Sequence, residues 1–208
     1  MKKYKEYLVL IIFTMGTQAL IYFVIKLFIN NYNIINSIIN IPLIKPFIYI
    51  YNLWYPFIII ITFLIYKHNK NIFRHLIGAL LLGAIFAQIT FILYPSMIIR
   101  PIVEVHSITD WVLNFTYVKD TPAVNCIPSM HCIYCFIVIF YLTKCKNMNY
   151  KIKILSIIFL LIIVLSTMFT KQHVIEDVIL AFIYSVIAIG VIEVSKKRID
   201  QIFKKLNM

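Results

Sequence analysis

Two residues near the C-terminal third of the chain could do nucleophilic chemistry. His173 and Asp177 stand four residues apart, so on a helix they share one face. A carboxylate there can accept one imidazole N–H and leave the other ring nitrogen as a lone-pair nucleophile or base. Glu176 competes for this role, although an acid in the first helical turn is also favoured by the helix dipole alone. We expect Asp177 to be the partner of His173.

A second histidine stands at the start of another apolar run, in Pro128-Ser129-Met130-His131. Proline suits a first helical turn and serine can cap it. His131 is then placed where its ring can reach a ligand bound at the helix end. Read alone, the segment is also an ordinary capped helix.

The basic residues near these motifs could hold an anion. Arg100 lies in the long connection 94–127, which mixes apolar residues with Trp111 and Tyr117 at irregular spacing. Tryptophan and tyrosine favour the membrane interface, so Arg100 is either a ligand-binding cation or a solvated part of an aromatic anchor. Lys171 stands two residues before His173 and has the same two interpretations, as an anion ligand or a snorkelling lysine.

Neither a metal nor another cofactor is expected. The histidines and acids show no H-E-x-x-H spacing, and a His/Asp pair four residues apart is satisfied without metal. Cys132 and Cys135 have redox-motif spacing but lie inside an apolar run, which favours core packing.

The composition predicts the elements that position these residues. The chain is 62% hydrophobic and 13% charged, against about 25% charged in soluble domains, and its mean hydropathy is +0.91. Soluble and disordered classes are excluded, and we predict an all-α, polytopic membrane protein that forms a single six-helix domain over residues 1–208. The first apolar run is too long for a signal peptide and is expected to be retained. The six predicted spans are 7–28, 48–66, 73–93, 128–143, 154–170 and 174–194.

The positive charge predicts orientation. The net charge of +12 would suggest nucleic acid in a soluble chain, but no nucleic-acid partner is expected here, because 15 of the 20 cations fall at the two termini and in the second and fourth connections. The positive-inside rule then places both termini in the cytoplasm. The connection 94–127 becomes an outer re-entrant or interfacial segment, and the fourth and sixth spans begin on the outer side. Helix N-termini favour bound phosphate, so an anion site is expected there.

Together, Arg100-Pro101, Pro128-Ser129-x-His131 and Ser166-x6-His173-x3-Asp177 resemble the three motifs of the type 2 phosphatidic acid phosphatase superfamily. The motif-bearing part is 94–177, and the six-span layout extends the similarity over most of the chain.

The resemblance implies a role for each motif residue. His173 would attack phosphorus to give a phosphohistidine, Asp177 would orient it, and His131 would protonate the leaving alkoxide and later activate the acceptor. Arg100 and Ser129 would hold the phosphoryl oxygens.

The motifs also depart from the family pattern. Leu93 stands where the family's first motif has lysine, and Thr167 follows Ser166 where the third has arginine. Lys171 is a candidate replacement for these cations. The segment from Ser166 to His173, together with Pro128 to His131, is closer to the branch that includes inositol phosphorylceramide synthases.

These observations predict a metal-independent integral membrane lipid phosphatase. Its substrate would be a lipid phosphate monoester or diphosphate of the phosphatidic acid, phosphatidylglycerol phosphate or polyprenyl diphosphate type. The alternative is a lipid phosphotransferase, and a less favoured one is a channel, transporter or scaffold, which would carry ionisable residues near mid-bilayer. We expect the plasma membrane, with an extracytoplasmic active site. Richness in Ile, Asn and Lys suggests a bacterial source, and the sequence indicates no oligomeric state.

Overall fold

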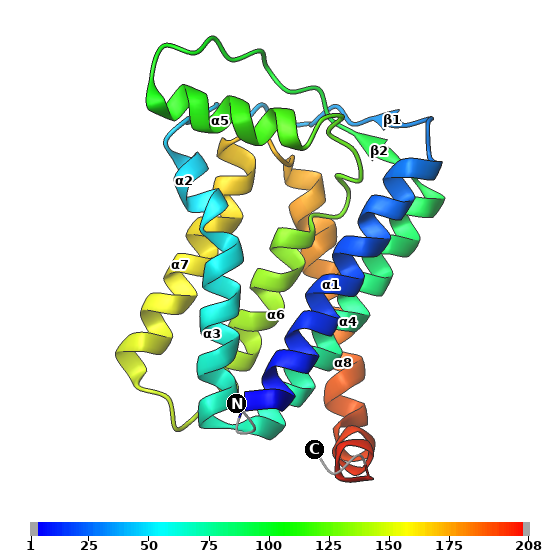
Figure 1. The fold of residues 1–208 in the computed structure, drawn as a ribbon, viewed down its shortest axis with the longest axis vertical. Helices are drawn as coiled ribbons and strands as arrows, with labels where there is room; N and C mark the ends of the chain where they lie inside the picture. Colours follow the sequence, from blue (N-terminus) through cyan, green and yellow to red (C-terminus); the bar gives the residue numbers. More distant parts are fainter. Residues whose placement is uncertain (1–3, 206–208) are drawn as a thin grey trace.

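The computed structural model describes residues 4–205 and is a bundle of apolar helices with a short helix lying across one end (Figure 1). The bundle consists of α1 (Lys5–Phe28), α3 (Trp54–His68), α4 (Lys70–Leu93), α6 (Met130–Lys144), α7 (Tyr150–Phe169) and α8 (Ile175–Lys205). The short helix α2 (Phe47–Asn52) leads into α3, and α5 (Ile108–Lys119) crosses the end of the bundle. The predicted all-α class is confirmed.

The number of membrane spans is supported only in part. Four helices, α1, α4, α7 and α8, have the length and apolar character needed to cross a bilayer, within the described residues. The apolar helices α3 and α6 have 15 residues each. Since a helix rises about 1.5 Å per residue, each is about 22 Å long, against about 30 Å of hydrocarbon. The six-span arrangement therefore stays a prediction.

The predicted second span is divided at Leu53. Pro56 stands in the first turn of α3 and has no N–H to donate to the carbonyl of Asn52, so the helix loses a hydrogen bond at that point. Residues 47–68 nevertheless run almost continuously as α2 and α3, which together match the predicted span 48–66. The last helix, α8, continues to Lys205, well past its predicted end at residue 194.

The core of the bundle forms around α6. This helix packs against α3, α4, α7 and α8, and Tyr134, Cys135 and Tyr141 are among its fully buried side chains. Gly83 on α4 lets the two backbones approach closely, because a Cβ there would lie 2.8 Å from Ile133 Cγ2. Cys132 and Cys135 are free thiols inside this core, as the sequence predicted.

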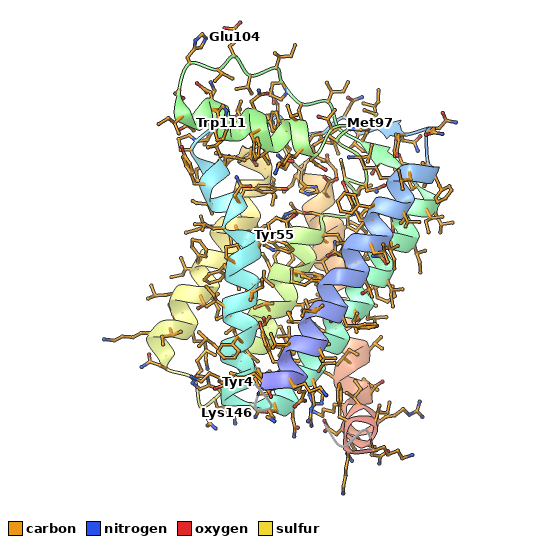
Figure 2. The ribbon with its side chains drawn as sticks, viewed as in Figure 1. Tyr4, Tyr55, Met97, Glu104, Trp111 and Lys146 are labelled. Atoms are coloured by element: carbon orange, nitrogen blue, oxygen red, sulfur yellow. The ribbon has the colours of Figure 1, made fainter. Side chains whose placement is uncertain are left out.

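The connection 94–127 closes the end of the bundle opposite to the termini. Figure 2 shows Glu104, Trp111 and Met97 at this end and Tyr4 and Lys146 at the other. Strand β2 (Ser96–Met97) pairs in parallel with β1 (Asn33–Ile34) and so joins the first and third connections. One face of α5 buries Leu113 and Tyr117 against α2, whereas Ile108, Trp111, Phe115 and Val118 form an exposed apolar stripe. This stripe suits an interfacial position, which remains a prediction.

Candidate functional site

The end of α7 places the predicted nucleophile. The helix stops in a Schellman motif, in which Lys171 N–H donates to Met168 O and Gln172 N–H donates to Thr167 O, at 3.0 and 2.9 Å. Lys171 occupies the left-handed position, with φ of 53°. His173 N–H also donates to Thr167 O, at 3.0 Å, so the backbone holds His173 just before α8.

His173 and Asp177 form the predicted pair. His173 Nδ1 lies 3.0 Å from Asp177 Oδ2, which also accepts from Val174 N–H at 3.1 Å. Asp177 has no exposed side-chain surface, and the His173 side chain is 11% exposed. An ionised carboxylate can only accept, so a neutral imidazole paired with it donates from Nδ1 and keeps its lone pair on Nε2. Glu176 turns away, accepting from Ser37 Oγ and Ile38 N–H.

His131, in the first turn of α6, lies close to His173. The two ring centroids are 6.0 Å apart, and the His131 ring also lies against Tyr51 and Trp54. Its Nε2 is buried and has no hydrogen-bond partner within residues 4–205. An imidazole nitrogen left unpaired beside a cavity is available to a ligand.

Ser129 begins α6 as the sequence predicted. It is fully buried, and its Oγ caps the helix by accepting from Cys132 N–H at 3.4 Å. Its own N–H donates to Asp177 O at 3.3 Å, which ties the start of α6 to the start of α8. In the structure the Ser129 side chain caps the helix, and its contact with a substrate stays a prediction.

Arg100 is held in the site by hydrogen bonds that the sequence did not indicate. It donates through Nη2 to Asp120 Oδ2 at 2.6 Å and to Gln172 Oε1, and through Nη1 to the carbonyls of Tyr117 and Asp120. The guanidinium also lies 5.1 Å from the centroid of the Tyr117 ring. Burial raises the pKa of Tyr117 to about 12, so its hydroxyl stays protonated and donates to Thr170 O at 2.7 Å.

Lys171 lies on the other side of the loop from Arg100. Its Nζ donates to Asn40 Oδ1 at 3.1 Å, and it lines a separate cavity of about 270 Å³ beside the first connection. His173 lines both this small cavity and a larger one of about 930 Å³ between α1 and α3. The structure therefore does not bring Lys171 together with Arg100, and its role as a replacement cation remains a prediction.

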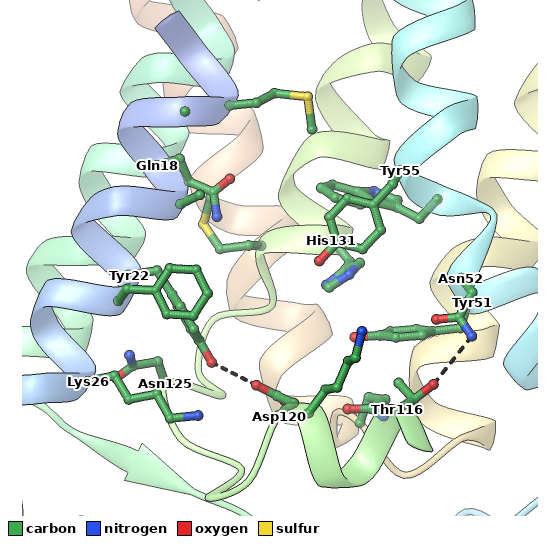
Figure 3. A pocket seen from close by; sticks show the side chains of 18 of the residues that line it. Gln18, Tyr22, Lys26, Tyr51, Asn52, Tyr55, Thr116, Asp120, Asn125 and His131 are labelled. Atoms are coloured by element: carbon green, nitrogen blue, oxygen red, sulfur yellow. Dashed lines mark hydrogen bonds between the residues drawn. The ribbon is translucent and has the colours of Figure 1, made fainter. Parts of the chain in front are cut away.

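A cavity of about 930 Å³ brings the other site residues together (Figure 3). It lies between α1 and α3 under the third connection, and its walls include Arg100, His131, Gln172 and His173. Apolar residues of α1 and α3 continue the wall along the bundle, namely Leu8, Ile11, Ile12, Met15, Phe23, Trp54 and Ile59. A ligand with one polar end and one long apolar end fits this lining.

Several polar atoms around this cavity have no hydrogen-bond partner within residues 4–205. They are Arg100 Nε, His131 Nε2, Gln172 Nε2 and both amide atoms of Asn125. Leaving buried polar atoms unpaired costs about 1–3 kcal/mol each, so such a cluster indicates a place for a polar ligand.

Several residues of the site were not predicted from the sequence. Gln172 stands inside the motif from Ser166 to His173, but Asp120, Asn125 and Tyr22 have no motif spacing. Tyr22 donates to Asp120 Oδ1 at 3.0 Å across 98 residues of sequence, so only the fold brings them together. The described residues contain no group of three or more His, Cys, Asp or Glu side chains arranged to hold a metal ion.

Comparison with known proteins supports one family. A protein-family profile described as the PAP2 superfamily matches residues 18–191, which include every predicted site residue. No curated protein and no solved structure matches the chain. The match covers most of the chain and spans Arg100, His131 and His173, which line the cavity, and also Asp177, which pairs with His173. This membrane-type helical protein thus belongs to the PAP2 superfamily, whose members are typically phosphatases or phosphotransferases.

Proposed function

We propose that this chain is an integral membrane lipid phosphatase that acts through a phosphohistidine on His173. The observation that carries the proposal is the placement of two histidines, 6.0 Å apart by ring centroid, where a large apolar cavity meets unpaired polar atoms. The cavity suits a lipid chain, and the polar end suits a phosphate group. Family membership supports the reaction class.

The first half of the reaction forms a covalent intermediate. His173 Nε2 attacks phosphorus while Asp177 holds the proton on Nδ1, so an N–P bond forms and the P–O bond to the lipid breaks. His131 gives its proton to the leaving alkoxide. Arg100 binds the phosphoryl oxygens as charge moves onto them, with Ser129 as a second proposed contact.

The second half releases phosphate. His131 takes a proton from water, the water oxygen attacks phosphorus, and the N–P bond breaks to restore His173. If a lipid hydroxyl takes the place of water, the same intermediate gives transfer instead of hydrolysis. A lipid phosphotransferase is therefore the alternative outcome of the experiment.

We further propose the orientation. Helix α1 begins and α8 ends at one end of the bundle, whereas α5 and the connection 94–127, which contributes Arg100 and Asp120 to the cavity, lie at the other end (Figures 1 and 2). The lysine- and arginine-rich connections share the end that bears the termini, which supports a cytoplasmic position for it. The polar end of the cavity, which Arg100 and Asp120 line, then lies near the extracytoplasmic face of the plasma membrane.

A panel of lipid phosphates tests the proposal. Purified full-length protein is given phosphatidic acid, phosphatidylglycerol phosphate or a polyprenyl diphosphate, with and without ceramide or diacylglycerol, in EDTA. Mass spectrometry should detect the dephosphorylated lipid and free phosphate, and His173→Ala should abolish both. A phosphorylated acceptor lipid would identify a transferase. Turnover that His173→Ala retains, or that EDTA abolishes and zinc restores, would contradict the mechanism.

A further inference from the structure

The guanidinium of Arg100 is already occupied at both terminal nitrogens. Nη1 donates to Tyr117 O at 3.5 Å and Asp120 O at 3.3 Å, and Nη2 donates to Asp120 Oδ2 and Gln172 Oε1. An arginine has five N–H donors, and here only the one on Nε has no partner within the described chain. A phosphate that binds two of the nitrogens, as arginine–phosphate pairs usually do, must displace one of these partners.

Asp120 is the partner that a phosphate can replace. Its carboxylate carries the same sign of charge as a phosphate and makes the same kind of contact with Nη2. The side chain of Asp120 is 36% exposed, so it has access to solvent, whereas that of Arg100 is only 9% exposed. The other acceptors are two backbone carbonyls and the side-chain Oε1 of Gln172, a residue whose main-chain N–H donates to Thr167 O.

The same carboxylate also holds the wall of the cavity. Asp120 Oδ1 accepts from the hydroxyl of Tyr22 on α1, as Figure 3 shows, and Tyr22 lines the cavity beside Arg100. Lys26, one turn further along α1, donates to Thr121 O at 3.3 Å. Asp120 thus links the substrate-facing arginine to the end of α1.

We propose that Asp120 is a displaceable counterion of Arg100. It neutralises the buried guanidinium while the cavity is empty and gives up its place on Nη2 when a phosphate group arrives, which also releases Tyr22. Asp120 is a positioning residue, since it acts through Arg100, and it sets the affinity for the phosphate group without entering the chemical step. The inference rests on the proposed function only in taking a phosphate group as the ligand of Arg100.

The test replaces Asp120 with asparagine in the full-length protein and measures the binding of inorganic phosphate by the shift of the melting temperature. Asp120→Asn keeps the size and the acceptor for Tyr22 but removes the competing charge. The dissociation constant for phosphate should fall about two- to fivefold, since a partly exposed ion pair contributes up to about 1 kcal/mol. The KM for phosphatidic acid should fall by a similar factor with kcat unchanged, and Asp120→Glu should restore wild-type values.

Asp110→Asn is the matched control. It removes an acid of α5 that pairs with Lys45 and does not line the cavity, so phosphate affinity should stay at the wild-type value. If Asp120→Asn binds phosphate equally well or more weakly than wild type, Asp120 merely supports Arg100 and the inference is overturned. It is also overturned if wild-type protein does not bind phosphate.

A measurement on the unaltered protein covers the case in which Asp120→Asn does not fold. Added phosphate should increase hydrogen–deuterium exchange in residues 20–26 and 119–124, because the contact between Tyr22 and Asp120 is released. Unchanged or decreased exchange there overturns the inference. If phosphate binds as expected but no lipid is turned over, the inference stands and the proposed phosphatase activity is refuted.

Discussion

Replacing Asp177 with asparagine removes the charge behind the proposed nucleophile and keeps its shape. Asp177 Oδ2 accepts from His173 Nδ1 at 3.0 Å, and the carboxylate has no exposed surface to be screened by water. When His173 Nε2 bonds to phosphorus the ring becomes positively charged, so this carboxylate matters most at that step. Breaking a buried charge pair costs about 3–5 kcal/mol, and each 1.36 kcal/mol is tenfold in rate, which predicts a fall in kcat of about 10²- to 10⁴-fold.

The assay is release of phosphate from the best substrate of the lipid panel, followed at saturating concentration. Glu176→Gln is the matched control, since this neighbouring acid binds Ser37 and Ile38 instead of the histidine. Its kcat should stay within about threefold of wild type, as expected for a substitution away from the reacting groups. An Asp177→Asn enzyme within tenfold of wild type, or an equal loss in Glu176→Gln, would refute the pairing as the source of catalysis.

Three further predictions concern stability, each measured as a melting temperature. Lys171→Gly should raise it by about 2–4 °C, because glycine removes about 1 kcal/mol of strain at the left-handed position; an unchanged value contradicts the strain. Gly83→Ala should cost about 1–3 kcal/mol where α4 meets α6, whereas Gly16→Ala, in open space, should cost nothing; equal effects contradict the close approach. Hydrogen bonds from Lys45 and Ser107 lower the pKa of Asp110 to about 2, so this carboxylate stabilises the fold fully above its ordinary pKa of about 4. The difference in melting temperature between wild type and Asp110→Asn should therefore disappear as the pH falls from about 4 to 2. A difference that does not depend on pH would contradict the lowered pKa of Asp110.

The long helices were predictable because apolar length is a strong local feature. The runs that became α1, α4 and α7 end where charged or polar residues begin, and the structure agrees within a few residues. The extension of α8 was not predictable from hydropathy, because residues 195–205 are mostly polar, whereas in the structure Ile199 packs against the core and Asp200 pairs with His75 of α4. Likewise α5 has an apolar stripe on its exposed side, so its periodicity does not reveal which face is buried.

In the candidate site, too, local contacts could be predicted from the sequence and long-range contacts could not. The pairing of His173 with Asp177 follows from a spacing of four residues and was predicted correctly. The contacts of Arg100 with Asp120 and Gln172 join residues 20 and 72 positions apart, so no local pattern encodes them. The position of Lys171 beside His173 predicts a role at the anion site, but the structure pairs its Nζ with Asn40, which is 131 residues away, and that role stays a prediction.

The carbonyl of Thr167 accepts the N–H groups of both Gln172 and His173. Two neighbouring residues, Gln172 beside the arginine and His173 as the proposed nucleophile, are therefore held by one main-chain atom and not by each other. A change of side chain at position 172 alters what surrounds the arginine while the nucleophile stays where the backbone puts it. Under the proposed function, such an arrangement would let substrate preference change through residue 172 while the position of the nucleophile is kept.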